Sequence, residues 1–187
     1  MCIRDSFNTA DLCDDNADIQ IAKPIFKLFG ENKNFYGRIR TVSVLDDNSY
    51  VKKLVEEKVN GDVMVVDGKG STKCALLGDN LARIACNNGW SGFIINGCIR
   101  DSEIINKIGI GVKAISIMPI KSEKKDAGEY GKSLNFADVI FTDGDYVYSD
   151  PDGIIISKSQ LINETDALSN NSLPYIHVTY VKKMSDE

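Results

Sequence analysis

Histidine is almost missing from this chain of 187 residues, since the one histidine is His177, near the C-terminal end. Ser-His-Asp and Cys-His nucleophile systems each need an imidazole, and zinc sites commonly use several. The sequence therefore disfavours all three kinds of site. Any chemistry has to be carried by carboxylates, arginine and backbone amides.

Cysteine is scarce as well, and its five residues form no CxxC pair. An odd number of scattered thiols suits a reduced, cytosolic protein better than a disulfide framework. The five are Cys2, Cys13, Cys74, Cys86 and Cys98.

Long apolar runs and long basic runs are also absent. No stretch approaches the length of a membrane span, and no signal peptide with a basic head and an apolar middle is visible. The net charge is -5 without a Lys/Arg cluster, whereas a nucleic-acid groove has to neutralise phosphates. We therefore expect a cytoplasmic protein with no membrane partner and no direct nucleic-acid partner.

The first six residues look foreign to the rest of the chain. Residues 1–6 nearly repeat residues 98–102, but the flanking sequences do not match, as they would in a genuine repeat. They also resemble a translated adapter sequence. We treat them as extraneous, so Arg4 and Asp5 are not site candidates.

The remaining chain has the composition of one soluble domain, with 43% hydrophobic and 26% charged residues. We assign residues 7–158 to this domain and residues 159–187 to a polar C-terminal extension. No low-complexity segment or internal linker divides the domain.

Strand and helix patterns alternate through the middle of the chain, which predicts an α/β core. Expected strands cover 37–45, 63–66, 93–95, 112–118, 134–141, 146–149 and 153–157. Expected helices cover 9–14, 49–58 and 79–88, with a short one beginning near Asp101.

Two glycine-rich turns follow apolar strands, at residues 67–71 and around Gly78. Ligands of open α/β sheets bind at this edge, where helix N-termini converge. Gly78 permits close backbone approach, and the amides of Asn80 and Leu81 open a helix. Such amides carry partial positive charge and suit a carboxylate.

Arg100, Asp101 and Asp79 complete a set of groups suited to a 2-oxo acid. The guanidinium of Arg100 can grip a carboxylate with two parallel hydrogen bonds. The two aspartates supply the hard oxygen ligands that Mg²⁺ prefers, and Mg²⁺ needs only one or two of them. A cation and an arginine held together could stabilise the enolate that forms when a bond next to the oxo group breaks.

The spacing of Asp79, twenty residues, then Arg100-Asp101 resembles the signature of the class II 4-hydroxy-4-methyl-2-oxoglutarate aldolases. The wider sequence resembles their relatives named regulator of ribonuclease activity A. The matching segments are 65–70, 75–85, 89–92, 97–101, 144–146 and 152–154.

This resemblance implies a β/β/α "swivelling" sandwich in one domain that assembles into a trimeric ring, with sites between subunits. It implies that Arg100 binds the pyruvyl carboxylate, that Asp101 ligates Mg²⁺ or Mn²⁺, and that Asp79 acts through a metal-bound water. The substrate implied is a 2-oxo acid cleaved to pyruvate, with oxaloacetate decarboxylation as a second activity. In these enzymes a glutamate from the neighbouring subunit's C-terminal region also approaches the metal. Glu164 and Glu187 are candidates for this glutamate by their location alone.

Other interpretations stay open. Asp79 and Asp101 could each be a helix-terminal charge, and Arg100 with Asp101 a surface ion pair. Under a rival function the chain is a protein that inhibits an RNA-processing ribonuclease by contact, without catalysis. A methyltransferase lacks support because no nucleotide-binding glycine fingerprint is present.

Four further features have both a plain and a functional explanation. Lys69 and Lys73 lie in a polar turn and are expected to be solvated, not to form a Schiff base. Cys98 and Trp90 are expected to pack in the core. The charged segment 119–131 is expected to be a solvated loop, with a cleft wall or lid as the alternative.

Overall fold

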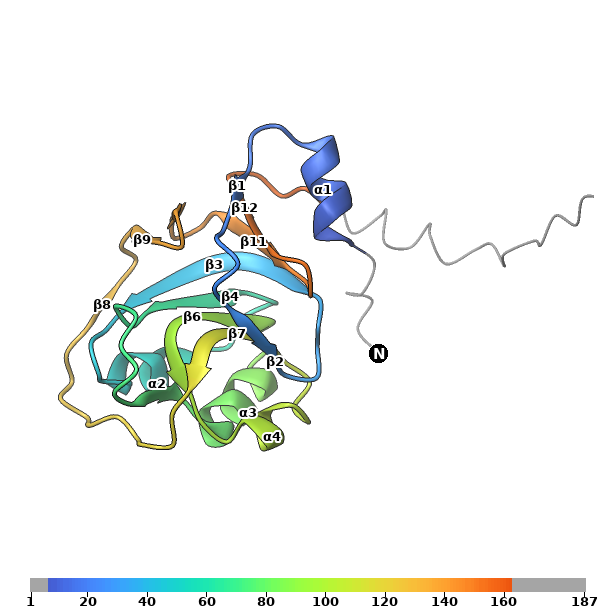
Figure 1. Cartoon of the computed structure of the whole chain (residues 1–187). Helices are drawn as coiled ribbons and strands as arrows, with labels where there is room; N and C mark the ends of the chain where they lie inside the picture. The colour runs from blue at the N-terminus through green and yellow to red at the C-terminus, as the bar shows by residue number, and fades with distance from the viewer. Residues whose placement is uncertain (1–6, 163–187) are drawn as a thin grey trace, which may run out of the picture.

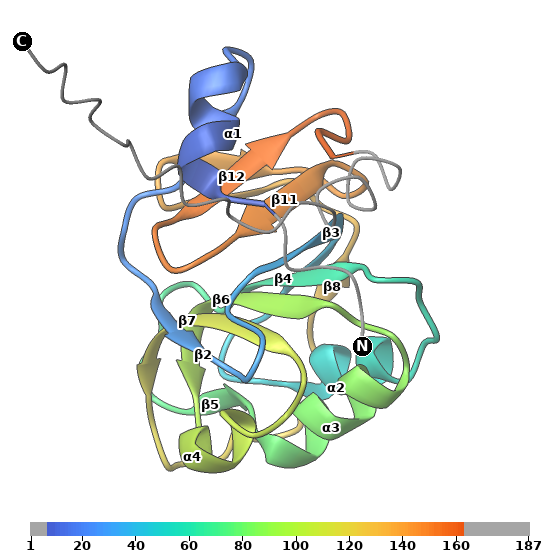
Figure 2. The same cartoon turned by 90° about the vertical axis from the view of Figure 1, so that its right-hand side faces the viewer.

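The structure, a computed structural model, describes residues 7–162, which form three layers (Figure 1). The main sheet has ten strands, and its path runs β1-β12-β11-β3-β4-β6-β7-β2, with β5 paired to β6 and β8 paired to β3. Helices α2, α3 and α4 lie under the β4-β6-β7 part, while β11 and β12 form the layer on the other side (Figure 2). The expected β/β/α sandwich in a single domain is confirmed.

Parallel strands form the centre of this sheet. They are β3 (Phe35–Ser43), β4 (Val63–Asp67), β6 (Gly92–Ile99) and β7 (Gly111–Ile117), with β5 (Ala75–Leu77) parallel to β6. In β4 the side chains alternate between two cores: Val63 and Val65 face the second β layer, and Met64 and Val66 face the helices. Burial on both faces explains why β4 is a continuous apolar run.

Three helices cover one face of the parallel strands. They are α2 (Ser49–Val55), α3 (Asp79–Asn87) and α4 (Ser102–Ile105). Trp90 closes the end of this core, is 3% exposed, and donates its indole N–H to the Glu57 carbonyl at 3.1 Å. Cys98 is 1% exposed in β6. Both residues therefore pack in the core, as expected.

Antiparallel strands build the second β layer and the sheet edges. They are β1 (Gln20–Ile21), β2 (Lys27–Phe29), β8 (Glu129–Tyr130), β9 (Leu134–Phe136), β10 (Val139–Phe141), β11 (Tyr146–Ser149) and β12 (Ile154–Ser157). The first helix, α1 (Thr9–Asp15), packs on this layer because the Thr9 amide and hydroxyl both donate to the Asp150 carboxylate at 2.7 Å.

One strand prediction was wrong. Residues 134–141 form the hairpin β9-β10 instead of a single strand, because Ala137 and Asp138 both take left-handed φ values of 54° and 60° and reverse the chain. The helix predicted over 49–58 also ends earlier, at Val55. None of the helices in residues 7–162 has the length and apolar character needed to cross a membrane.

Candidate active site

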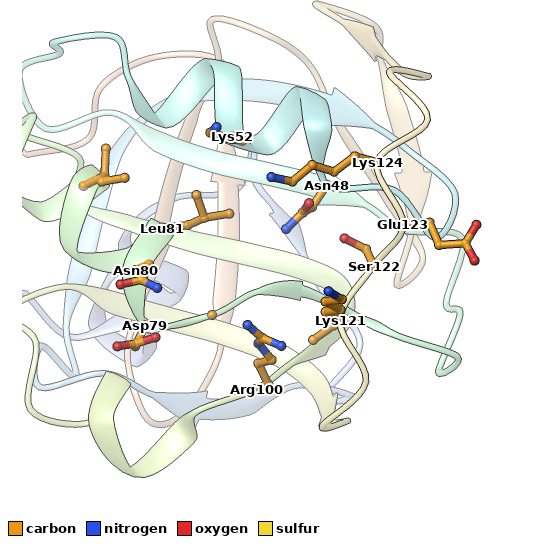
Figure 3. Close-up of a pocket in the computed structure, with 13 residues that line it drawn as sticks. Asn48, Lys52, Asp79, Asn80, Leu81, Arg100, Lys121, Ser122, Glu123 and Lys124 are labelled. Carbon is orange, nitrogen blue, oxygen red and sulfur yellow. The ribbon is translucent and has the colours of Figure 1, made fainter.

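A cleft of about 670 Å³ opens at the edge where β5 and β6 end (Figure 3). Its volume is in the range of small-molecule sites. Its walls come from the start of α2, the start of α3, Arg100 after β6, and the segment 121–124. Ala75 bonds to the Ile120 carbonyl at 2.7 Å, which brings that last segment alongside β5.

The N-terminus of α3 forms the first wall. Gly78 is the N-cap residue in extended conformation, and Ala82 is the first residue whose amide reaches back to the Gly78 carbonyl, at 3.1 Å. The amides of Asn80 and Leu81 therefore have no partner within the helix. Both residues line the cleft, and free N–H groups at a helix N-terminus are suited to an anion.

Arg100 and Asp101 lie directly against Gly78. The Arg100 Nε is 3.3 Å from the Asp101 Oδ2, and the Arg100 amide donates to the Leu77 carbonyl at 2.9 Å. A Cβ on residue 78 would lie 3.0 Å from the Asp101 Oδ2 and 3.2 Å from the Arg100 Nε. A Cβ at this position would be crowded and would displace Arg100 and Asp101 by a few tenths of an ångström. The arginine, the carboxylate and the helix N-terminus therefore form one contact group.

The predicted site residues gather around this cleft. Gly78, Asp79, Asn80, Leu81 and Arg100 all line it, and the Arg100 guanidinium points into it (Figure 3).

Asp101 does not line the cleft and lies at its margin, in contact with Arg100. Its backbone is left-handed at φ 55°, in the N-cap position of α4, yet its side chain makes no capping hydrogen bond. A plain capping role for Asp101 is thus not supported.

Asp79 has a weak structural partner. Its Oδ2 is 3.8 Å from Arg83 Nε, one turn further along α3, and its side chain is 23% exposed. A pair of this kind contributes about 0–0.5 kcal/mol to stability. Asp79 is therefore able to take part in chemistry within the cleft.

The glycine-rich turn at 67–71 does not line the cleft. Asp67 accepts from the Lys69 amide at 2.9 Å and from the Asn96 side chain at 2.8 Å, while the Lys69 ammonium pairs with its other oxygen at 2.6 Å. Lys73 is 83% exposed and 4.0 Å from Asp46. Neither lysine has the desolvated surroundings that a Schiff base needs.

The wall opposite α3 belongs to the charged segment 119–131, for which the sequence suggested a cleft wall only as the alternative to a solvated loop. Lys121, Ser122, Glu123 and Lys124 line the cleft, and Glu123 points away from it (Figure 3). No local pattern identifies these residues, because their position depends on pairing with the distant strand β5. Two more residues line the cleft that the sequence did not suggest as site residues. They are Asn48, just before α2, and Lys52 on α2.

Asp47 fastens this wall to the start of α2. Its Oδ2 accepts from the amides of Lys125 at 2.9 Å and Ala127 at 3.0 Å, and its Oδ1 accepts from Ser49 at 2.7 Å. Burial raises the pKa of Asp47, but the hydrogen bonds from Ala127, Ser49 and Lys125 lower it more, to about 2.

The carboxylates in the cleft and at its margin have the chemistry that suits a hard divalent cation. Within residues 7–162, no three His, Cys, Asp or Glu side chains come together in a metal-binding group. Asp101 and Asp79 instead offer one or two carboxylates, a number that suits Mg²⁺ because this ion keeps several waters. The Asp101 side chain is 34% exposed, so its carboxylate is open to an ion. Glu164, Glu187 and His177 lie outside the described residues.

Asp47→Asn is expected to lower the free energy of unfolding by about 2 kcal/mol at pH 7. The folded-state pKa lies below the ordinary value of 3.8, so the contribution is present above about pH 4 and lost as the pH falls toward 2. Urea unfolding between pH 7 and pH 2.5 measures it. Asp126→Asn, on the same loop in an exposed pair with Lys53, is the control and should change little. Equal effects of the two variants would contradict this role of Asp47.

Comparisons with known proteins identify the family to which this β/β/α sandwich belongs. The family model described as RraA-like, Aldolase/RraA, matches residues 9–156. A protein of Arabidopsis thaliana named "Putative 4-hydroxy-4-methyl-2-oxoglutarate aldolase 3" is 44% identical, over 83% of this chain and 98% of its own length. A protein of Marinomonas sp. with the same name, without a number, is 48% identical over 81% and 94%.

Two solved structures have a fold similar to that of this chain. One, described as an S-adenosylmethionine:2-dimethylmenaquinone methyltransferase of Geobacillus kaustophilus, has a TM-score of 0.81 at 45% identity, covering 83% of this chain and 97% of that one. The RNA-processing inhibitor RraA of Thermus thermophilus has a TM-score of 0.82 at 36% identity, covering 85% and 97%. The chain belongs to the RraA-like family.

Proposed function

We propose that this chain is a divalent-metal-dependent lyase that cleaves 4-hydroxy-4-methyl-2-oxoglutarate and similar acids to pyruvate, and that it also decarboxylates oxaloacetate. The observation that carries this proposal is the contact group of Gly78, Arg100 and Asp101 beside the free amides of α3. The names of the relatives at 44–48% identity support the same substrate class.

Binding comes first in this mechanism. The guanidinium of Arg100 donates two hydrogen bonds to the carboxylate next to the oxo group. The amides of Asn80 and Leu81 hold the same end of the substrate through the partial positive charge of the α3 N-terminus. The amides are fixed by the helix, and the guanidinium is held beside the Asp101 carboxylate at 3.3 Å. Little reorganisation is therefore needed when the reaction begins.

Proton transfer falls to Asp79. In the retro-aldol reaction the substrate's 4-hydroxyl loses its proton, the C3–C4 bond breaks, and its electron pair moves to the 2-oxo oxygen as an enolate. Asp79 and Glu123 are the two carboxylates that line the cleft, and we assign this role to Asp79 because Glu123 points away and pairs with Lys125 at 3.2 Å. Asp79 takes the hydroxyl proton through a water as C4 becomes the carbonyl carbon of the second product. Return of that proton to C3 of the enolate then gives pyruvate.

Stabilisation of the enolate is shared between the protein and the cation. A divalent cation such as Mg²⁺ or Mn²⁺, when bound, would supply positive charge that stabilises the enolate. Asp101 would hold this ion, and Arg100 keeps the Asp101 carboxylate in place through the 3.3 Å contact. Oxaloacetate loses carbon dioxide to give the same enolate, so the same groups serve both reactions.

A second candidate function is contact inhibition of a ribonuclease. The similarity to the RNA-processing inhibitor RraA of Thermus thermophilus favours it. A protein that acts only by surface contact gains nothing from Asp79 and Arg100 in one cleft with Asp101 at its margin, so we rank this function second.

Methyl transfer ranks lower. S-adenosylmethionine carries a positively charged sulfonium, whereas Lys52, Arg100, Lys121 and Lys124 give the cleft a positive lining. The charges of cofactor and site would repel each other.

The activity test uses purified protein and oxaloacetate, with pyruvate release followed over time. Mg²⁺ should be required, and EDTA should abolish the reaction. Asp101→Ala should lower kcat by about 10²–10³-fold, because one stabilising contact of the transition state is lost. The variant's thermal unfolding serves as the control for folding.

The activity proposal fails if no 2-oxo acid is turned over in the presence of Mg²⁺ or Mn²⁺. Inhibition of an RNA-processing endonuclease by the same preparation would then support the second candidate.

A homotrimer in the cytoplasm belongs to the same proposal. Two exposed apolar side chains flank the cleft segments: Leu45 is 60% exposed just before α2, and Ile120 is 59% exposed just before Lys121. Covering such side chains is a common reason for assembly. A neighbouring chain on this surface would also close the cleft.

Sedimentation equilibrium should give the mass of three chains for the wild type and a smaller mass for Ile120→Asp, because a charge would be buried at the interface. A single-chain mass for the wild type would contradict the trimer.

A further inference from the structure

Ser122 carries a buried hydroxyl without a partner. Its Oγ has no hydrogen bond within residues 7–162, and the residue is only 8% exposed. A hydroxyl that is withdrawn from water without a partner costs free energy, so native structures seldom keep one without a reason. The hydroxyl lines the cleft and points toward its interior (Figure 3), where a ligand could supply the missing hydrogen bond.

Two further groups point toward the same space. The Asn48 side-chain nitrogen donates one hydrogen to the Leu76 carbonyl at 3.3 Å, which leaves its second hydrogen for a ligand. The Lys124 ammonium reaches over the cleft from the same wall as Ser122 (Figure 3) and makes no ion pair within the described part of the chain. Two neutral donors and a cation thus converge at the side of the cleft facing α3.

The positive charge of the residues that line the cleft favours an anionic ligand. Lys52, Lys121 and Lys124 line the cleft, and none of them is ion-paired among the described residues, whereas Lys53, Lys69 and Lys125 elsewhere each have a carboxylate partner. The pyruvyl end of a substrate is already bound by Arg100 and α3. A second anionic group at the other end would therefore meet Ser122, Asn48 and Lys124.

We propose that Ser122, Asn48 and Lys124 form a subsite for the second carboxylate of the substrate, and that Ser122 is its specificity-determining residue. The proposal rests on the proposed function, because that function places the pyruvyl end at Arg100. Asp47 acts as a positioning residue, since its bonds to Lys125 and Ala127 hold the Ser122 wall in register with Asn48.

The binding of two ligands, measured without turnover, tests this subsite separately from the pyruvyl site. Pyruvate has the 2-oxo acid end alone, while 2-oxoglutarate adds a second carboxylate and carries no 4-hydroxyl for retro-aldol cleavage. Calorimetric titration in the presence of Mg²⁺ should show tighter binding of 2-oxoglutarate by the wild-type protein. Ser122→Ala should weaken 2-oxoglutarate about tenfold, the effect of one hydrogen bond to a charged group, and leave pyruvate unchanged.

Ser149 provides a matched control. It lies at the end of β11, is fully buried, and has the other hydroxyl without a partner within residues 7–162, but it does not line the cleft. Ser149→Ala should change the affinity for neither ligand. Lys124→Met should weaken 2-oxoglutarate severalfold at low salt and less at high salt, because the ammonium is exposed and screened.

Failures of the two proposals can be told apart. Equal wild-type affinities for the two ligands, or a Ser122→Ala effect that is the same for both, would overturn the subsite even if oxaloacetate is turned over. Discrimination that depends on Ser122 in a protein without turnover would leave the subsite standing and remove only the lyase. Thermal unfolding of each variant shows that altered affinity does not come from a misfolded chain.

Discussion

The contact of Arg100 and Asp101 with the bare backbone of Gly78 is the constraint on which the rest of the site depends. A Cβ on residue 78 would lie within about 3.2 Å of both groups and would displace them by a few tenths of an ångström. Gly78 is also the N-cap of α3, and the same contact therefore brings the guanidinium and the carboxylate to the free amides of a helix. An anion bound there is held by fixed donors, and the proposed chemistry needs such fixed donors.

The parallel sheet makes this contact possible, because the ends of its neighbouring strands meet at one edge. The Arg100 amide bonds to the Leu77 carbonyl, which joins the end of β6 to the end of β5 just before α3 begins. On the other side, Asp47 ties the loop after β7 to α2 through buried bonds to Lys125 and Ala127. In the proposed function the first wall recognises a carboxylate by geometry, and the second wall adds mainly positive charge and the Ser122 hydroxyl.

Elements with a strong local signal could be predicted from the sequence. The apolar run of β4 and the glycine before Asp79 predicted a strand end and a helix start, and Gly78, Asp79, Asn80, Leu81 and Arg100 do line one cleft. The wall at 121–124 could only be suggested, because its place depends on the bridge between Lys121 and Ala75. The hairpin β9-β10 was missed because two consecutive left-handed non-glycine residues have no clear sequence signal.

The central claim is that this cleft stabilises the enolate of pyruvate, and proton exchange at the pyruvate methyl group tests it most directly. Pyruvate is incubated in D₂O with Mg²⁺ and the protein, and the methyl signal is followed by NMR. We predict exchange well above the background rate for the wild type, and background exchange for Arg100→Ala and Asp101→Ala. Exchange at the background rate in the wild-type protein would contradict the claim.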